Sequence, residues 1–140
     1  MELSLGCGHL DDEEFVQGFE ECTLQPGAFH HADHIRLAWL YVQRYGASGA
    51  EARLLEGIRR MAQHAGVPQK FLYTTTVAWA RLVAAAEKDG VAKESFFGWI
   101  QRHPALLNRE LLANYYSPGS LETAEARSGW VEPDLAPLED

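Results

Sequence analysis

The chain has 140 residues, a length typical of one domain with its own hydrophobic core. Its net charge of −8 at pH 7 argues against binding to nucleic acid or to an anionic membrane surface, because both ligands require a basic protein surface. Apolar residues make up 46% of the chain, so we expect order along most of it. We predict a single domain over residues 1–140, with residues 1–10 and 132–140 as flexible or surface-hugging ends.

The sequence also predicts a cytoplasmic protein. The first residues lack the basic region and apolar stretch of a secretory signal, and no apolar run is long enough to span a bilayer. The two cysteines, Cys7 and Cys22, lack the spacing of a metal-binding motif. We therefore expect reduced thiols, with a Cys7–Cys22 disulfide as the less favoured alternative.

Helical spacing of apolar residues recurs along the first half of the chain, and strand-like alternation is absent. Residues 11–22 place their apolar side chains on one helical face. A second helix is expected over residues 32–45, ending at Gly46. A capping-box pattern at residues 48–51 predicts the start of a third helix, which ends before Pro68.

The second half of the chain predicts shorter helices. A fourth helix is expected over residues 75–88, and a fifth, around Phe96 to Ile100, ends before Pro104. Asn108 is a suitable cap for a sixth helix with its apolar residues turned inward, and Ser120 for a short last one.

The second predicted helix is apolar on nearly all sides, which is typical of a helix at the centre of a bundle. Leu37 and Leu40 project from one side of it, and Trp39 and Val42 from the other. The sequence therefore predicts an all-α, single-domain bundle of five to seven helices with a central apolar helix.

The start of this helix holds three of the six histidines, in the segment Phe29-His30-His31-Ala32-Asp33-His34-Ile35-Arg36. Helical spacing places His31 in line with Ile35, and His34 beside it. Both imidazoles are then expected to point inward at the mouth of the helix, while Asp33 and Arg36 lean away from them.

Three interpretations fit these residues. In the first, His31 and His34 transfer protons and Asp33 orients one imidazole. In the second, His30 and His34 bind a divalent metal, zinc or iron, with His64 as a further ligand. In the third, the segment is structural: a histidine caps the helix, Asp33 complements its dipole, and His34 satisfies a buried backbone group. We favour a catalytic or metal-binding role for these residues over a purely structural one.

Further polar residues are candidates for contact with a substrate. Arg36 can bind a carboxylate or a phosphate, although a surface ion pair explains it equally well. Tyr73, Thr74 and Thr76 lie where the fourth helix begins, and a helix N-terminus attracts anions. A threonine N-cap is the structural alternative there. Tyr115, at the end of the sixth predicted helix, is a further candidate, for which packing is the alternative.

Several of these segments resemble a family of small bacterial helical proteins usually described as uncharacterised. The resemblance covers about residues 28–137 and rests on the F-H-H-A-D-H-x-R-x-A-W motif at 29–39, Tyr73 and the three threonines after it, residues 104–107, Tyr115-Tyr116, Ala126-Arg127 and Pro133-Asp134. It implies that these segments form one site. Many members carry a histidine directly after the tyrosine, in a Y-H-x-T pattern, where this chain has Thr74. That difference is compatible with altered or lost activity and makes a bound metal less expected.

From these residues we predict a small cytoplasmic enzyme acting on a small polar or anionic molecule by histidine acid/base chemistry. A lyase, an isomerase or a hydrolase is compatible with this prediction, with or without a divalent metal. The alternative is a non-catalytic module that binds a small molecule or another protein. A homodimer is compatible with both. Redox chemistry with a nucleotide is not suggested, because the sequence has no glycine-rich phosphate-binding motif.

Overall fold

A computed structural model of the protein describes residues 6–24, 27, 29–87 and 94–138. No β-strand occurs in these residues, so the predicted all-α class is confirmed. The α-helices are α1 (Asp12–Glu20), α2 (His31–His64), α3 (Tyr73–Glu87), α4 (Phe96–Arg102) and α5 (Ala124–Ser128). One 3₁₀ helix, η1 (Pro68–Lys70), lies between α2 and α3, and three lie between α4 and α5: η2 (Pro104–Leu107), η3 (Leu111–Asn114) and η4 (Ser120–Glu122). Within the same residues, no helix has the length and apolarity needed to cross a membrane.

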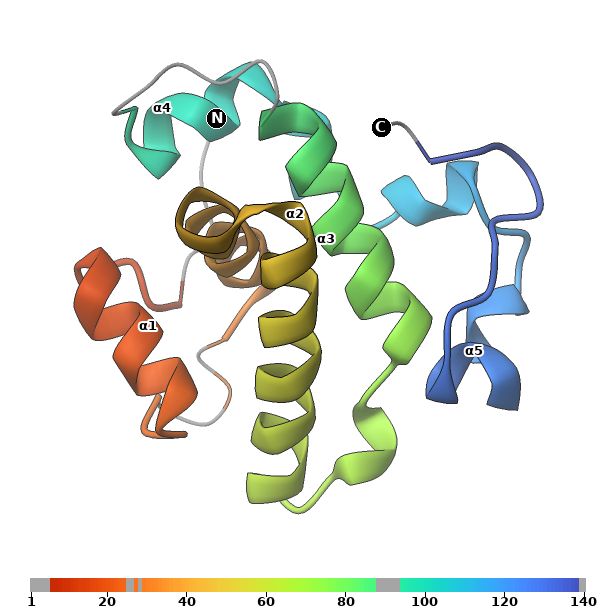
Figure 1. Ribbon diagram of the computed structural model, residues 1–140, viewed down its shortest axis with the longest axis horizontal. Helices are drawn as coiled ribbons and strands as arrows, with labels where there is room; N and C mark the ends of the chain where they lie inside the picture. Colours follow the sequence, from red (N-terminus) through yellow and green to blue (C-terminus); the bar gives the residue numbers. More distant parts are fainter. Residues whose placement is uncertain (1–5, 25–26, 28, 88–93, 139–140) are drawn as a thin grey trace.

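Helix α2 bends sharply at Gly46, where the sequence predicted the end of one helix. Gly46 has a φ of +76°, a left-handed conformation that favours glycine, and helix resumes directly after it. In Figure 1 the part of α2 before the bend is viewed nearly end-on, whereas the part after it runs down the page. The two expected helices are therefore present, joined by one residue instead of a loop.

The first half of α2 carries much of the core. All residues from 35 to 41 are buried. Helices α1 and α3 lie on opposite sides of α2 (Figure 1). Trp39 packs against Trp99 of α4 with ring centroids 6.1 Å apart, and Tyr41 packs against Phe19 of α1 at 6.5 Å. Burying each large apolar side chain contributes roughly 1.5–3 kcal/mol, so these contacts hold the helices together.

The second half of α2 approaches α1 closely at a glycine. A Cβ atom added to Gly57 would lie 2.3 Å from Cε2 of Phe19, which is inside van der Waals contact. The absence of a side chain at Gly57 therefore allows α1 to pack this close to α2.

Helix α1 begins with a capping box: the Asp11 carboxylate accepts from the Glu14 N–H at 2.8 Å, and the Glu14 carboxylate accepts from the Asp11 N–H at 3.1 Å.

Two charged residues near the start of α2 hold the N-terminal segment. The buried Asp33 carboxylate accepts from the main-chain N–H groups of Gly6 at 2.8 Å, Cys7 at 3.0 Å and His30 at 2.8 Å. Arg36 donates to the carbonyls of Cys7 and Leu10 at 3.2 and 2.8 Å. Residues 6–10 are thus fixed to α2, whereas residues 1–5 of the expected loose end lie outside the described residues. Neither Cys7 nor Cys22 forms a disulfide.

The C-terminal third differs from the predicted sixth helix. Instead of an α-helix starting at Asn108, the chain forms η2 and η3 as separate turns, and the Asn108 carboxamide oxygen accepts from the Glu110 N–H at 3.0 Å. This local bond competes with helix propagation. The C-terminal residues 134–135 are hydrogen-bonded to the segment that follows η3. The Leu135 N–H donates to the Tyr115 carbonyl at 2.9 Å, and the Asp134 carboxylate accepts from the Ser117 N–H, also at 2.9 Å.

We predict that Asp33→Asn destabilises the protein by about 3 kcal/mol, because the carboxamide turns a donor toward N–H groups that need an acceptor. Asp12→Asn is the matched control. Asp12 pairs with Arg36 at 2.9 Å, but its side chain is 52% exposed, so we expect a loss below about 1 kcal/mol. Urea unfolding at pH 7.5 measures both losses. Equal losses in the two variants would contradict the proposed role of Asp33.

Candidate functional site

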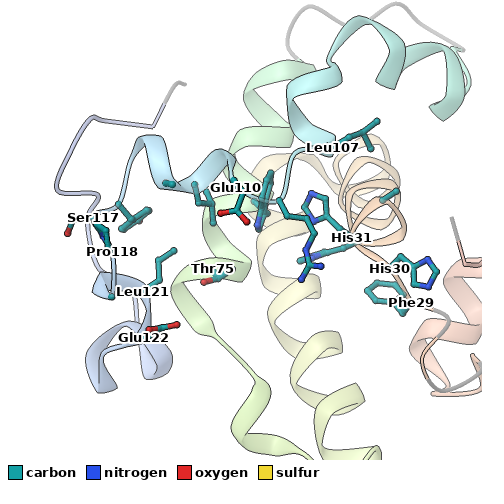
Figure 2. Close-up of a pocket in the computed structure, with 18 residues that line it drawn as sticks. Phe29, His30, His31, Thr75, Leu107, Glu110, Ser117, Pro118, Leu121 and Glu122 are labelled. Atoms are coloured by element: carbon teal, nitrogen blue, oxygen red, sulfur yellow. The ribbon is translucent and has the colours of Figure 1, made fainter. Parts of the chain in front are cut away.

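A cavity of about 900 Å³ lies between the start of α2, the first turns of α3 and the segment from η2 to η4. In Figure 2, Thr75 of α3 lies between His31 on one side and Leu121 and Glu122 on the other. The wall of residues 116–122 is held from behind by the C-terminal segment, since the Tyr116 hydroxyl donates to the Val131 carbonyl at 2.8 Å. The cavity therefore depends on segments far apart in the sequence.

His31 lines this cavity and has a defined tautomer. Its Nε2 lies 2.9 Å from the Leu106 carbonyl oxygen. A carbonyl only accepts, so the proton of the neutral ring is on Nε2 and Nδ1 is unprotonated. The ring also packs edge-on against Trp79, with centroids 4.6 Å apart. Nδ1 makes no hydrogen bond to the described residues, which leaves it available as a proton acceptor.

The surroundings of His31 favour the neutral ring. Burial lowers its pKa, the hydrogen bond to Leu106 partly opposes this effect, and the positive charge of Arg109 lowers the pKa further. Arg109 itself is exposed, lines the cavity, and has no hydrogen bond or ion pair with the part of the chain that the structure describes. A neutral imidazole and an unpaired guanidinium are thus neighbours at this site.

His34 lies on the same face of α2, one turn after His31, and is also neutral. Its Nε2 is fully buried and has no hydrogen-bond partner in the described structure. Burial, followed by the effect of His31, lowers the pKa of His34 to about 4. The ring contacts Phe29, with centroids 6.2 Å apart. A ring with this pKa and a shielded Nε2 is a weak base at pH 7, so of the two predicted catalytic imidazoles His31 is better placed.

The three threonines of α3 have different surroundings. The Thr74 hydroxyl is buried, donates to the Gly129 carbonyl at 2.6 Å and accepts from the Val131 N–H at 3.1 Å. The Thr76 hydroxyl donates to the Leu72 carbonyl at 2.8 Å. Neither residue lines the cavity, although both were predicted to contact a substrate. Thr75 does line it, and its hydroxyl makes no hydrogen bond to the described residues.

Asp33 and Arg36 also lie outside the cavity. The Asp33 carboxylate accepts hydrogen bonds from three main-chain N–H groups. The Arg36 guanidinium donates to two carbonyls and to the Asp12 carboxylate, and it lies 4.5 Å from the centre of the Phe15 ring. The helix turns by about 100° per residue, which places these two residues on the face opposite His31 and His34. Their hydrogen bonds are structural, and they do not meet the imidazoles.

The two predicted tyrosines are not brought to the cavity either. Tyr73 lines a separate groove of about 610 Å³ along the second half of α2, with Arg59, Arg60 and Gln63 among its other residues. Tyr115 is half-buried and packs against the core. Its neighbour Tyr116 borders the cavity instead.

The predicted metal ligands are not assembled. His30 and His34 border the cavity, but His64 is the last residue of α2, and the helix after the Gly46 bend is roughly 27 Å long. Among the described residues, no group of three or more His, Cys, Asp or Glu side chains could hold a metal ion. From the sequence, His64 is expected only at the end of a predicted helix, and no pattern fixes where that end lies relative to His30 and His34.

Several cavity residues were missed from the sequence: Thr75, Trp79, Arg109, Glu110 and Glu122. The rotation of about 100° per residue in a helix points the side chains of Thr74, Thr75 and Thr76 in three different directions. The sequence therefore indicated that the three threonines would not share one environment, although it did not single out Thr75. Trp79 follows Thr75 by four residues and lies on the same face of α3. The sequence carries no comparable signal for the other three, since their positions depend on non-helical backbone between η2 and η4.

We predict that the stability of the protein falls as the pH is lowered from 7.5 to 5, by about 2 kcal/mol from His34 alone. The ring has a pKa of 6.5 when exposed in the unfolded chain and about 4 in the folded state. The unfolded state therefore binds more protons between these values, and stability is lost as the pH falls through 6.5. Urea unfolding at both pH values measures the change.

Two variants test the assignment of this pH dependence. His34→Gln is expected to remove most of it, whereas His64→Gln, at an exposed position, is expected to preserve it. An unchanged pH dependence in His34→Gln would show that another group is responsible.

Comparisons of the chain with protein-family models, with curated proteins and with solved structures found no match.

Proposed function

We propose that the cavity binds a small polar molecule with an anionic group and that His31 transfers a proton on it. The observation that supports this most directly is the unprotonated Nδ1 of His31, in a cavity that also contains the unpaired guanidinium of Arg109. The cavity volume, about 900 Å³, lies within the range of small-molecule sites.

The charge of Arg109 links binding to proton transfer. Arg109 lowers the pKa of His31, so the ring is neutral when the ligand arrives. An anionic group bound at Arg109 offsets that charge and makes His31 more basic in the complex than in the free protein. By linkage, protonation of His31 strengthens binding of the anion to the same extent.

The chemistry best suited to this arrangement is removal of a proton from a carbon or oxygen close to the anionic group. His31 accepts the proton on Nδ1, and Leu106 holds the ring through Nε2. Arg109 stabilises negative charge that develops on the ligand. The hydroxyl of Thr75, which has no partner in the described structure, supplies a hydrogen bond to a polar group of the ligand. An isomerase, a lyase and a hydrolase can all use such a base.

A binding module without catalysis is the second candidate, and one observation favours it. Because Nε2 of His34 is shielded and Nε2 of His31 is bonded to Leu106, the cavity offers few imidazole nitrogens for a separate acid and base. In that case Arg109, Thr75 and His31 would bind a ligand and release it unchanged.

We predict that Arg109→Gln raises the pKa of His31 in the free protein, because it removes the positive charge that lowers it. In the natural sequence, addition of acetate or inorganic phosphate is expected to raise that pKa, and this effect is expected to disappear in Arg109→Gln. NMR titration of the His31 Cε1–H resonance measures both. Arg127→Gln, exposed on α5 and away from the cavity, is the control. An anion effect that persists in Arg109→Gln would contradict the proposal.

We further predict that the protein catalyses exchange of carbon-bound hydrogen with solvent deuterium in one member of a panel of small carboxylic and keto acids. His31→Gln is expected to lower the exchange rate by about 100-fold or more, whereas His64→Gln is expected to have no effect. Proton NMR in D₂O follows the loss of the substrate signal. Saturable binding with no exchange and no product for any bound acid would favour the binding module.

A further inference from the structure

The cavity also contains negative charge that the proposed function has not used. Glu110 and Glu122 both line it, and both side chains are exposed. Neither carboxylate has a hydrogen bond or an ion pair with the described residues. With His31 and His34 neutral, these two carboxylates face one guanidinium, that of Arg109, so the formal charge of the lining is negative.

Other acidic residues of the chain are used differently. Asp12, Glu13 and Glu51 pair with Arg36, Arg44 and Arg81, respectively. Ion pairs with arginine are therefore common on this protein, yet Arg109 pairs neither with the adjacent Glu110 nor with Glu122. The charged side chains of Arg109, Glu110 and Glu122 are therefore available to pair with a ligand.

The positive and negative groups lie toward different ends of the cavity. In Figure 2, Glu122 lies on one side and His31 on the other, with Glu110 and Thr75 between them. Arg109 also lines the cavity, and its positive charge lowers the pKa of His31. The first turn of α2 begins at His31 and adds the partial positive charge of a helix N-terminus there. The cavity is therefore polarised, positive near His31 and negative near Glu122.

From this arrangement we infer that the ligand is a zwitterion: a small amino acid-like molecule whose acidic group lies at Arg109 and whose ammonium group lies between Glu110 and Glu122. This inference rests on the proposed function, since it uses the same cavity and the same anionic contact. A molecule with only negative charge meets two uncompensated carboxylates, whereas a zwitterion matches both ends. The glutamates thus select against simple anions.

The test uses matched probes that share a carbon skeleton. One set is β-alanine, propionate and propylamine, and a longer set is 6-aminohexanoate, hexanoate and hexylamine. Each is titrated into the full chain at pH 7.5, and dissociation constants are obtained from amide chemical shifts of cavity residues. In at least one set, the zwitterion is expected to bind about fivefold or more tightly than either singly charged probe.

Charge variants give the sharper readout. Glu110→Gln/Glu122→Gln is expected to weaken binding of the zwitterion and to strengthen binding of the matched carboxylate, so that the preference disappears. Arg109→Gln is expected to weaken both. Glu125→Gln, exposed on α5 outside the cavity, is the control for net charge and is expected to change neither. Circular dichroism verifies that each variant is folded.

The outcomes separate this inference from the proposed function. If in both sets the carboxylate binds in the cavity through Arg109 at least as tightly as its matched zwitterion, the inference is overturned and the anion site stands. If the double variant leaves the zwitterion preference unchanged, the glutamates do not select the ligand and the inference is again overturned. If no probe shifts the resonances of cavity residues, the inference and the binding step of the proposed function both fail.

Discussion

The buried carboxylate of Asp33 is the interaction on which the rest of the structure depends. Burying a charged group costs free energy unless hydrogen bonds within the protein replace those to water. For the Asp33 carboxylate, three main-chain N–H groups supply these hydrogen bonds. Two of them belong to the N-terminal segment and one to the residue just before α2. The same carboxylate therefore fixes the start of the helix and the segment packed on it. Because His31 and His34 lie on the opposite face of this first turn, the direction of both imidazoles follows from how Asp33 is held.

Two imidazoles with lowered pKa values distinguish the cavity. Burial disfavours the charged imidazole of both histidines, and Arg109 strengthens the effect at His31. The two rings nevertheless differ in what they can do. The His31 ring is held by the Leu106 carbonyl with one nitrogen unprotonated, whereas His34 keeps a buried nitrogen without a partner. Leaving such a nitrogen buried without a hydrogen-bond partner costs roughly 1–3 kcal/mol.

The cavity wall shows how side chains that look alike take different roles. Thr74 and Thr75 are neighbours with the same side chain. The Thr74 hydroxyl hydrogen-bonds to the main chain of residues 129 and 131 in the C-terminal segment, whereas Thr75 lines the cavity. The bonds of Thr74 help to hold residues 129–131 in place, and Val131 in turn accepts from Tyr116 on the cavity wall. The buried Thr74 therefore supports the wall of the cavity that the half-buried Thr75 also lines.

The sequence by itself determined the helical class, the interruption of helix at Gly46 and the face of the helix that carries His31 and His34. Each follows from short-range rules: apolar spacing, the conformational freedom of glycine, and the rotation of about 100° per residue in a helix. Only the tertiary structure decided which polar residues meet. Arg109, Glu110 and Glu122 reach the cavity through irregular backbone that no periodicity encodes, and His64 is kept away by the length of its helix. Asp33 and Arg36 have motif-like spacing, but apart from the His30 N–H their hydrogen-bond partners lie more than 20 residues away along the chain, where local patterns carry no information.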